Sequence, residues 1–424
     1  MSKLLTVNCK LLTALFSLLP LAVFPQRDNL FTLDAQLRTR AEYNNGAGTL
    51  RYNGEEPAFY VNNRTRLTAD YQRKNLELRA AAQHTGIWGD NDINKTAGNF
   101  SLNEAWAKIR TTQGLFFQVG RMPLAYDDER LLGAADWNLA GNWHDALRIG
   151  FENTTHQLHL FATYLQHADN IRGGYYADVM PYKQMQGLWY HLQIIPENPL
   201  GISAIAINTG YENGTQQHGK SLYMQTMGAY INWQPLNFQI TAEGYYQRGK
   251  TDISGTLYNV SAFMAAGRLA YTVPRIIRLQ AGYDYLSGND GLNVNEHAFN
   301  PLFGSYHKFF GAMDFFTGRA GYGLQDINAD ITAYLPRNIN IDLQYHNIRM
   351  AETLHFVDLD PKLGQEIDLS VTAPVIPNVT LQAGYSTIFA TPTLDVLKNG
   401  DHTRWHDFAY ITLNINPRLF ITNW

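Results

Sequence analysis

Apolar and polar residues alternate along most of this chain in segments about ten residues long. The first clear example is TLDAQLRTRAEY, residues 32–43, in which Leu33 and Leu37 share one face while Arg38 and Arg40 share the other. Successive side chains of a β-strand point to opposite faces, so a period of two predicts a strand. This segment therefore has one apolar and one charged face.

The same pattern recurs to the end of the chain, and it predicts about eighteen strands. They are expected at residues 32–43, 59–71, 75–83, 102–110, 114–120, 145–151, 156–165, 187–195, 202–211, 222–233, 236–247, 259–272, 278–286, 324–334, 339–348, 366–373, 379–388 and 407–415.

The connections between these strands alternate between short turns and long loops. Such sorting places turns at one end of a meander and loops at the other, which is typical of outer-membrane barrels with periplasmic turns and extracellular loops. Strands that face lipid must also close into a ring. We therefore predict an all-β fold, a transmembrane antiparallel β-barrel. The long loops are expected at 44–58, 84–101, 121–144, 166–186, 212–221, 248–258, 287–323, 349–365 and 389–406.

Composition agrees with a chain that crosses a membrane by strands. Of 424 residues, 45% are hydrophobic and only 17% charged, and no run of about 18 apolar residues follows the N-terminal segment. Residues 1–26 are predicted to be a signal peptide, which leaves 27–424 as the barrel in a bacterial outer membrane. The single cysteine, Cys9, lies in that peptide, and a net charge of -4 excludes a strongly basic nucleic-acid binder.

Charges on the faces opposite the apolar rows separate along the chain. The early strands carry mainly basic residues toward the bore, and the later strands mainly acidic ones, with Arg268 and Arg278 as exceptions. The predicted basic wall is Arg38, Arg40, Arg64, Arg66, Arg79, Lys108, Arg110 and Arg148, and the predicted acidic wall is Glu243, Asp284, Asp326, Asp330, Asp342, Glu366 and Asp368.

Facing walls of opposite charge would create a transverse field that sorts solutes in an aqueous bore. The alternative is that these groups pair across neighbouring strands and only fill the interior. About eighteen strands leave room for an open channel, and the loops 121–144 and 287–323 are long enough to fold into it.

Those two loops carry a family resemblance. The run GRMPLAYDDERLLGAADWNLAGNWHDALRIG, residues 120–150, resembles alginate-export family porins, in which Gly-Arg precedes an acidic-Arg-Leu-x-Gly turn, a Trp and an Asp-Ala-x-Arg strand start. AFNPLFGSYHKFFGAMDFF, residues 298–316, resembles the loop of Bacteroidetes members of that family. The motif residues are Arg121, Asp127, Arg130, Trp137, Asp145 and His307.

The resemblance implies a monomeric eighteen-stranded barrel that passes anionic alginate through an arginine-lined bore. The basic wall would hold the counterparts of those arginines by position, whereas the acidic wall departs from a wholly electropositive conduit. A general diffusion porin and a non-conducting structural or adhesive barrel are the alternatives.

No sequence motif supports catalysis or a metal site. Nucleophile-elbow, zinc and cysteine-pair motifs are missing, and His144 beside Asp145 is a weak candidate for loop chemistry. No cofactor is expected, although oxygen-rich segments 89–94 and 287–296 offer a remote chance of Ca²⁺. Expected partners are outer-membrane lipid and lipopolysaccharide, an anionic solute or polysaccharide, and the insertion machinery that reads the terminal Trp424.

Overall fold

The computed structural model describes residues 29–89, 99–166, 181–194, 199–213, 219–292, 294–355 and 358–424. The expected signal peptide and nearly all of the segment 89–94 lie outside the described residues. Among the residues that are described, no helix is long and apolar enough to cross a membrane.

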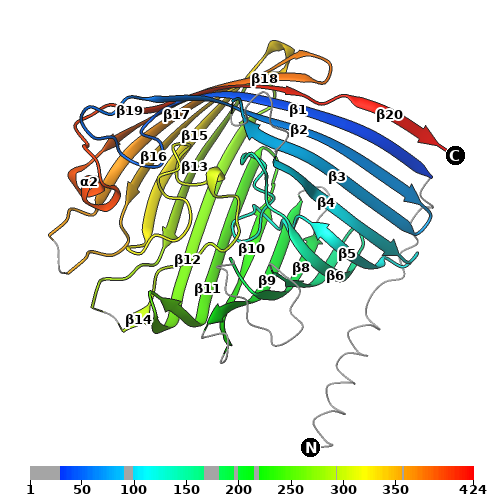
Figure 1. Ribbon diagram of the computed structural model, residues 1–424, viewed down its shortest axis with the longest axis horizontal. Helices are drawn as coiled ribbons and strands as arrows, with labels where there is room; N and C mark the ends of the chain where they lie inside the picture. The colour runs from blue at the N-terminus through cyan, green and yellow to red at the C-terminus, as the bar shows by residue number, and fades with distance from the viewer. Residues whose placement is uncertain are drawn as a thin grey trace, which may run out of the picture.

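Eighteen long antiparallel strands form a closed ring in the described part of the chain (Figure 1). Each strand pairs with its neighbours in sequence, and β1 pairs with both β2 and β19, which closes the barrel. The predicted number and order of strands are confirmed. The strands are β1 (Leu30–Asn45), β2 (Ala58–Arg73), β3 (Leu76–Ile87), β4 (Asn99–Arg110), β5 (Leu115–Met122), β6 (His144–Glu152), β7 (His156–Tyr164), β8 (Gln184–Ile194), β9 (Leu200–Asn213), β10 (Lys220–Trp233), β11 (Phe238–Ile253), β12 (Thr256–Val273), β13 (Ile277–Leu286), β15 (Leu324–Leu335), β16 (Ile339–Arg349), β17 (Lys362–Ile376), β18 (Val379–Ala390) and β19 (His406–Ile415).

Side-chain parity divides every strand into an outer and an inner row. In β1, Leu37 faces outward and is 40% exposed, whereas its neighbours Arg38 and Arg40 are buried inside the ring. The outer row of β11 likewise includes Phe238 and Tyr246, both exposed. An apolar outer surface and a polar interior are the arrangement that a lipid-embedded barrel requires.

Pro417 interrupts the last strand, as its missing N–H predicts. β19 ends at Ile415, and the chain then continues as β20 (Arg418–Asn423), which pairs with the start of β1. At this junction the N–H of Ala35 donates to the carbonyl of Pro417. The final residues therefore extend the wall of the barrel beyond β19.

One predicted long loop, 248–258, is wrong. β11 and β12 continue through this segment as a hairpin in which Ile253 pairs with Thr256. Asp252 accepts a hydrogen bond from the N–H of Gly255, and that glycine has a φ of +83°. A side-chain acceptor and a residue that tolerates positive φ suffice for a tight turn, so the strands need no longer connection.

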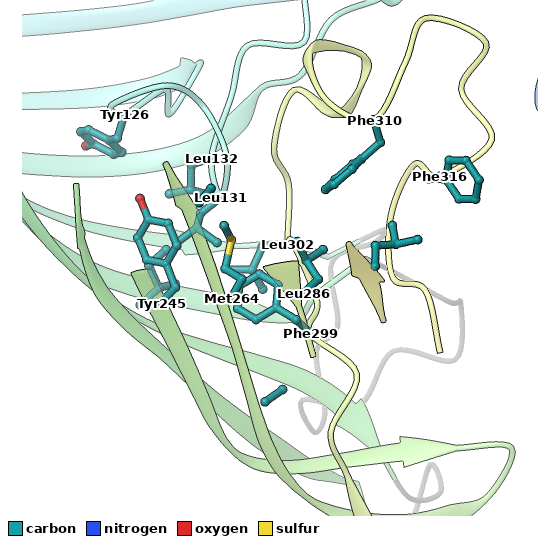
Figure 2. Close-up of a cluster of buried hydrophobic side chains, with 14 of the residues drawn as sticks. Tyr126, Leu131, Leu132, Tyr245, Met264, Leu286, Phe299, Leu302, Phe310 and Phe316 are labelled. Carbon is teal, nitrogen blue, oxygen red and sulfur yellow. The ribbon is translucent and has the colours of Figure 1, made fainter. Parts of the chain in front are cut away.

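Two long connections fold into the barrel. The first inner loop, residues 123–143, joins β5 to β6, and the second inner loop, residues 287–323, joins β13 to β15 and includes β14 (Asn295–Glu296) and the 3-10 turn η1 (Tyr306–Lys308). Figure 2 shows their apolar side chains meeting inward-facing residues of β11, β12 and β13. The buried cluster includes Leu131, Leu132, Phe299, Leu302, Tyr245, Met264 and Leu286.

Elsewhere a short helix, α2 (Pro392–Lys398), lies in the connection from β18 to β19. Thr391 caps it, since its side chain accepts from the N–H of Leu394. Leu394 is buried, and Leu397 packs against the same apolar cluster as the inner loops. Nζ of Lys398 lies 5.8 Å from the centroid of the Phe316 ring, so this connection contacts the second inner loop.

Candidate functional site

The two inner loops contact each other in the interior of the barrel. Leu132 and Phe303 form a parallel β-bridge, and the N–H of Gly133 donates to the carbonyl of Phe303 over 3.1 Å. The N–H of Ser305 donates to the carbonyl of Glu129 over 2.9 Å. Because main-chain bonds join them, the two loops form one structural unit across the bore.

Arg130 anchors the first inner loop to the acidic wall. Its guanidinium is 2% exposed and lies 3.0 Å from Glu243 of β11 and 2.5 Å from Asp284 of β13, with the ring of Phe309 3.5 Å below. Burial lowers the pKa of Arg130, but the two carboxylates outweigh it and raise that pKa above the ordinary arginine value. The charge on this residue is therefore firmly fixed.

The same loop is bound to the basic wall through its main chain. Arg38 of β1 donates to the carbonyls of Asp136 over 2.5 Å and Asn138 over 2.9 Å. Arg40 donates to the carbonyl of Trp137 over 3.1 Å. Arg64 and Arg66, which lie beside Arg38 in the basic wall, are on β2. In the ring of eighteen strands, β2 is nine strands away from β11 in either direction. The loop thus spans the bore from wall to wall.

Asp136 supplies the carboxylate that faces the basic wall. Its Oδ1 lies 2.8 Å from Nη2 of Arg64, and its Oδ2 lies 3.6 Å from Nη1 of Arg38. Arg64 is fully buried, yet neither of its Nη atoms makes an aligned hydrogen bond to any described residue. Its Nε donates to Gln36 over 2.9 Å. The sequence analysis did not single out Asp136, because a lone acidic residue in a loop carries no pattern.

Trp137 and His307, both named from the family motifs, come together between the loops. Their rings are parallel, with centroids 3.9 Å apart, and the guanidinium of Arg40 covers the indole at 4.0 Å. Nδ1 of His307 is 2.9 Å from a carboxylate oxygen of Asp314. Beside them lies a cavity of about 340 Å³ that both loops line.

The acidic wall also holds the second inner loop. The N–H of Met313 donates to Glu366 over 2.7 Å, and the N–H of Ala312 donates to Asp368 over 3.3 Å. Gly311 has a φ of +91°, and a Cβ there would lie 2.4 Å from the Glu366 carboxyl carbon. Only glycine lets the backbone approach Glu366 this closely.

A profile described as alginate export matches residues 30–395, most of the chain. The chain belongs to the alginate export family. No curated protein matches it significantly.

Solved porin structures share the fold of this alginate export family chain. OccK11 (OpdR) of Pseudomonas aeruginosa is 14% identical, with 94% of this chain and 100% of that chain covered and a TM-score of 0.61. OccAB1 of Acinetobacter baumannii is 10% identical over 92% and 97% of the two chains, with a TM-score of 0.62. OpdQ of P. aeruginosa is 12% identical over 92% and 98%, with a TM-score of 0.61. At these identities the likeness shows the barrel architecture alone.

In this alginate export family barrel, part of the basic wall is paired with neighbouring carboxylates. Lys108 and Arg110 lie 3.1 and 2.5 Å from Glu152, while Arg79 lies 2.7 Å from Asp70. For these three cations, the structure therefore agrees with pairing to carboxylates on nearby strands, which was the alternative to a free basic wall. The pattern predicts a strand only to residue 151, so Glu152 was missed, and β6 includes it as its last inward-facing residue.

Two other arginines of the family barrel have amide partners instead. Arg66 donates to Gln83 through Nε and Nη2 over 3.0 and 2.7 Å, and Arg148 donates to Gln118 over 3.2 and 2.6 Å. An amide oxygen satisfies a donor without neutralising its charge. These two side chains therefore keep a positive field inside the barrel.

The remaining acidic residues contact polar partners on adjacent strands. Asp326 lies 2.7 Å from His346, Asp342 accepts from Thr332 over 2.7 Å, and Asp330 accepts from Gln280. Asp127, one of the family-motif residues, accepts a hydrogen bond from the indole N–H of Trp189 over 3.1 Å. All of these except Asp127 lie on strands.

Arg121 and Asp145 form an ion pair on the outer face. They are directly opposed on β5 and β6, with Nε of Arg121 2.8 Å from Asp145, and both side chains are partly exposed. His144 points inward instead and lies 2.7 Å from the Tyr182 hydroxyl. His144 and Asp145, the candidate pair for loop chemistry, therefore face opposite sides of the wall.

The oxygen-rich segment at 287–296, where no cofactor was expected, is held by hydrogen bonds of its own residues and of His297. Asn289 donates to Glu296 over 2.9 Å and accepts from the N–H of His297 over 2.7 Å. In the described part of the chain, the residues that bring three potential ligand atoms within 4.8 Å of one another are Asp395, Asp401 and His402. Nδ1 of His402 contacts the carboxylate of Asp395 directly, which brings two of these three atoms together.

Proposed function

We propose that this protein is an outer-membrane channel that passes anionic solutes, including an anionic polysaccharide such as alginate. The observation that carries the proposal is the excess of arginine over carboxylate on the early strands. Arg38, Arg64 and Arg66 have a single carboxylate, that of Asp136, within 4.0 Å among the described residues. A positive stretch of an aqueous bore attracts anions and raises their local concentration.

Family membership and the barrel fold support a transport role without catalysis. We also propose that a signal peptide directs export and that the insertion machinery reads the terminal aromatic residue. The barrel would be a monomer in a membrane that contains lipopolysaccharide, and it would be related to Bacteroidetes members of the family. Each of these stays a prediction. The basic wall is the proposed path, with Arg66 and Arg148 as its least neutralised members.

The acidic wall has a second role in this proposal. Glu243, Asp284, Glu366 and Asp368 hold the inner loops in the bore, so they restrict its width rather than contact the solute. Anions would then pass through the cavity between the two inner loops, where Asp136 faces the arginines of the basic wall. Because the acidic residues hold the loops and the basic residues face the solute in this proposal, a chain with net charge -4 can still favour anions.

Reversal potentials across a planar bilayer under a KCl gradient test the proposal. We expect the wild-type barrel to favour chloride over potassium, and the double variant Arg66→Gln/Arg148→Gln to lose most of that preference. Arg121→Gln removes one positive charge from the outer face and is the control for Arg66→Gln and Arg148→Gln taken singly.

A barrel that folds and inserts but shows no conductance would support the structural or adhesive alternative. Conductance without ion preference in the wild type would support a general diffusion porin. Either result contradicts the proposed anion channel.

A further inference from the structure

We propose that Asp136 is an internal counter-ion that occupies a carboxylate-binding site at Arg64, and that a carboxylate of the passing solute displaces it. The inference rests on the proposed function, and it adds the class of ligand and the residue with which that ligand competes.

The charges around the site leave room for a second anion. Arg38 and Arg64 are directly opposed on β1 and β2, and Arg66 follows on the same inner row. Their side-chain partners other than Asp136 are the neutral amides Gln36 and Gln83. Within 4.0 Å these three guanidinium groups have between them one carboxylate among the described residues, and like charges this close repel one another unless an anion is near.

Arg64 is poorly satisfied by its present partner. The side chain is 0% exposed, and both Nη atoms lack an aligned hydrogen bond although Asp136 is only 2.8 Å away. A guanidinium binds a carboxylate best through two parallel hydrogen bonds. A carboxylate that is not tethered to the loop backbone can adopt that geometry, so it has an energetic advantage over Asp136.

Asp136 is also accessible from the interior space. Its side chain is 65% exposed and lines the cavity of about 340 Å³ between the inner loops, together with Trp137 and His307. Sugar-sized solutes fit a cavity of this volume. A solute in the cavity is therefore adjacent to the carboxylate that it has to replace.

Displacement does not require the loop to leave the wall. Arg38 and Arg40 hold residues 136–138 through main-chain carbonyls, and Arg130 holds the other end of the loop at Glu243. None of these contacts uses the Asp136 carboxylate. The side chain can rotate into the cavity while the backbone stays fixed.

The experiment measures block of single-channel current by D-glucuronate, with D-glucose as the neutral probe of the same size. In Asp136→Asn, which keeps the shape and the main-chain anchors, we expect half-maximal block at a concentration about tenfold or more below that of the wild type. The reason is that a tethered competitor acts at an effective concentration in the ~mM range, and the variant removes it. Block by glucose should not change.

Asp314→Asn is the matched control, because Asp314 lines the same cavity but pairs with His307 rather than with an arginine. It removes one negative charge without freeing Arg64. If both variants shift glucuronate block equally, the effect is a general change of field and the inference is wrong. Asp136→Ser frees Arg64 by a second route and is used if the asparagine variant does not insert.

The result separates the inference from the function on which it rests. An anion-selective channel in which neither Asp136 variant strengthens glucuronate block overturns the counter-ion role and leaves the channel function standing. A barrel without anion selectivity in any variant overturns the function itself. In the double variant Arg64→Gln/Asp136→Asn, the gain in glucuronate block should disappear.

Discussion

Arg130 and Asp136, six residues apart on one loop, contact opposite walls of the barrel. Arg130 lies 3.0 Å from Glu243 on β11, and Asp136 lies 2.8 Å from Arg64 on β2. Each of these two residues carries the charge that complements the wall it faces. The segregated charges of the barrel therefore position the first inner loop across the bore.

Removal of Arg130 should loosen this loop. Arg130→Met leaves the buried Glu243 without its cation, and breaking one partner of a buried ion pair costs about 3–5 kcal/mol. We expect a lower midpoint in urea unfolding from lipid vesicles and larger fluctuations of single-channel current. Arg130→Met/Glu243→Gln should recover part of the stability because it also removes the uncompensated charge.

The exposed ion pair of Arg121 and Asp145 on the outer face is the comparison for the buried pair of Arg130 and Glu243. Arg121→Met breaks the contact with Asp145, which is 49% exposed, and surface pairs contribute at most about 1 kcal/mol. Its unfolding midpoint and current noise should stay close to those of the wild type. Equal losses in the Arg130 and Arg121 variants would refute the anchoring role of Arg130.

Gly311 should tolerate no side chain. A Cβ at this position would clash with the Glu366 carboxyl group, whereas a Cβ at Gly318 would meet nothing within 4 Å. Both glycines have positive φ, +91° and +83°, so an alanine is strained equally by the backbone at either site. The difference between Gly311→Ala and Gly318→Ala in unfolding free energy therefore isolates the clash, and we expect about 1–3 kcal/mol.

Asp127 should make stability depend on pH. Burial raises the pKa of this loop carboxyl, although hydrogen bonds from Ser203 and Trp189 act against the shift. A raised folded-state pKa means that the favourable protonated form is lost as pH rises through that pKa, so stability falls toward neutral pH. Asp127→Asn cannot ionise, and asparagine also tolerates the φ of +56° found here.

Thermal unfolding at pH 4 and pH 8 measures this effect. The gain in midpoint of Asp127→Asn over wild type should be larger at pH 8 than at pH 4. Glu56→Gln, in an exposed loop, corrects for the loss of one negative charge. A gain that is equal at both pH values would show that the carboxyl does not ionise unfavourably in the fold.

The strands could be predicted because their information is local. A period of two, as in residues 32–43, places Leu37 and Arg38 on opposite faces whatever the rest of the chain does, and eighteen lipid-facing segments need a closed ring. The sequence also indicated which walls are basic and acidic. The predicted loop at 248–258 was wrong, because a tight turn at Ser254 and Gly255 joins two strands that continue through that segment.

The contacts of the inner loops depended on the tertiary structure. Loop residues have no period, so nothing local places Asp136 against Arg64 or Trp137 against His307. Those contacts follow from which strands lie nine apart on the ring and from how far each loop reaches. The sequence by itself determined the strands and the alternation of their two faces, and the tertiary structure decided which inward charges hold the loops and which pair with residues on neighbouring strands. The reason is that parity acts between adjacent residues, whereas charge pairing across the bore depends on residues distant in the chain.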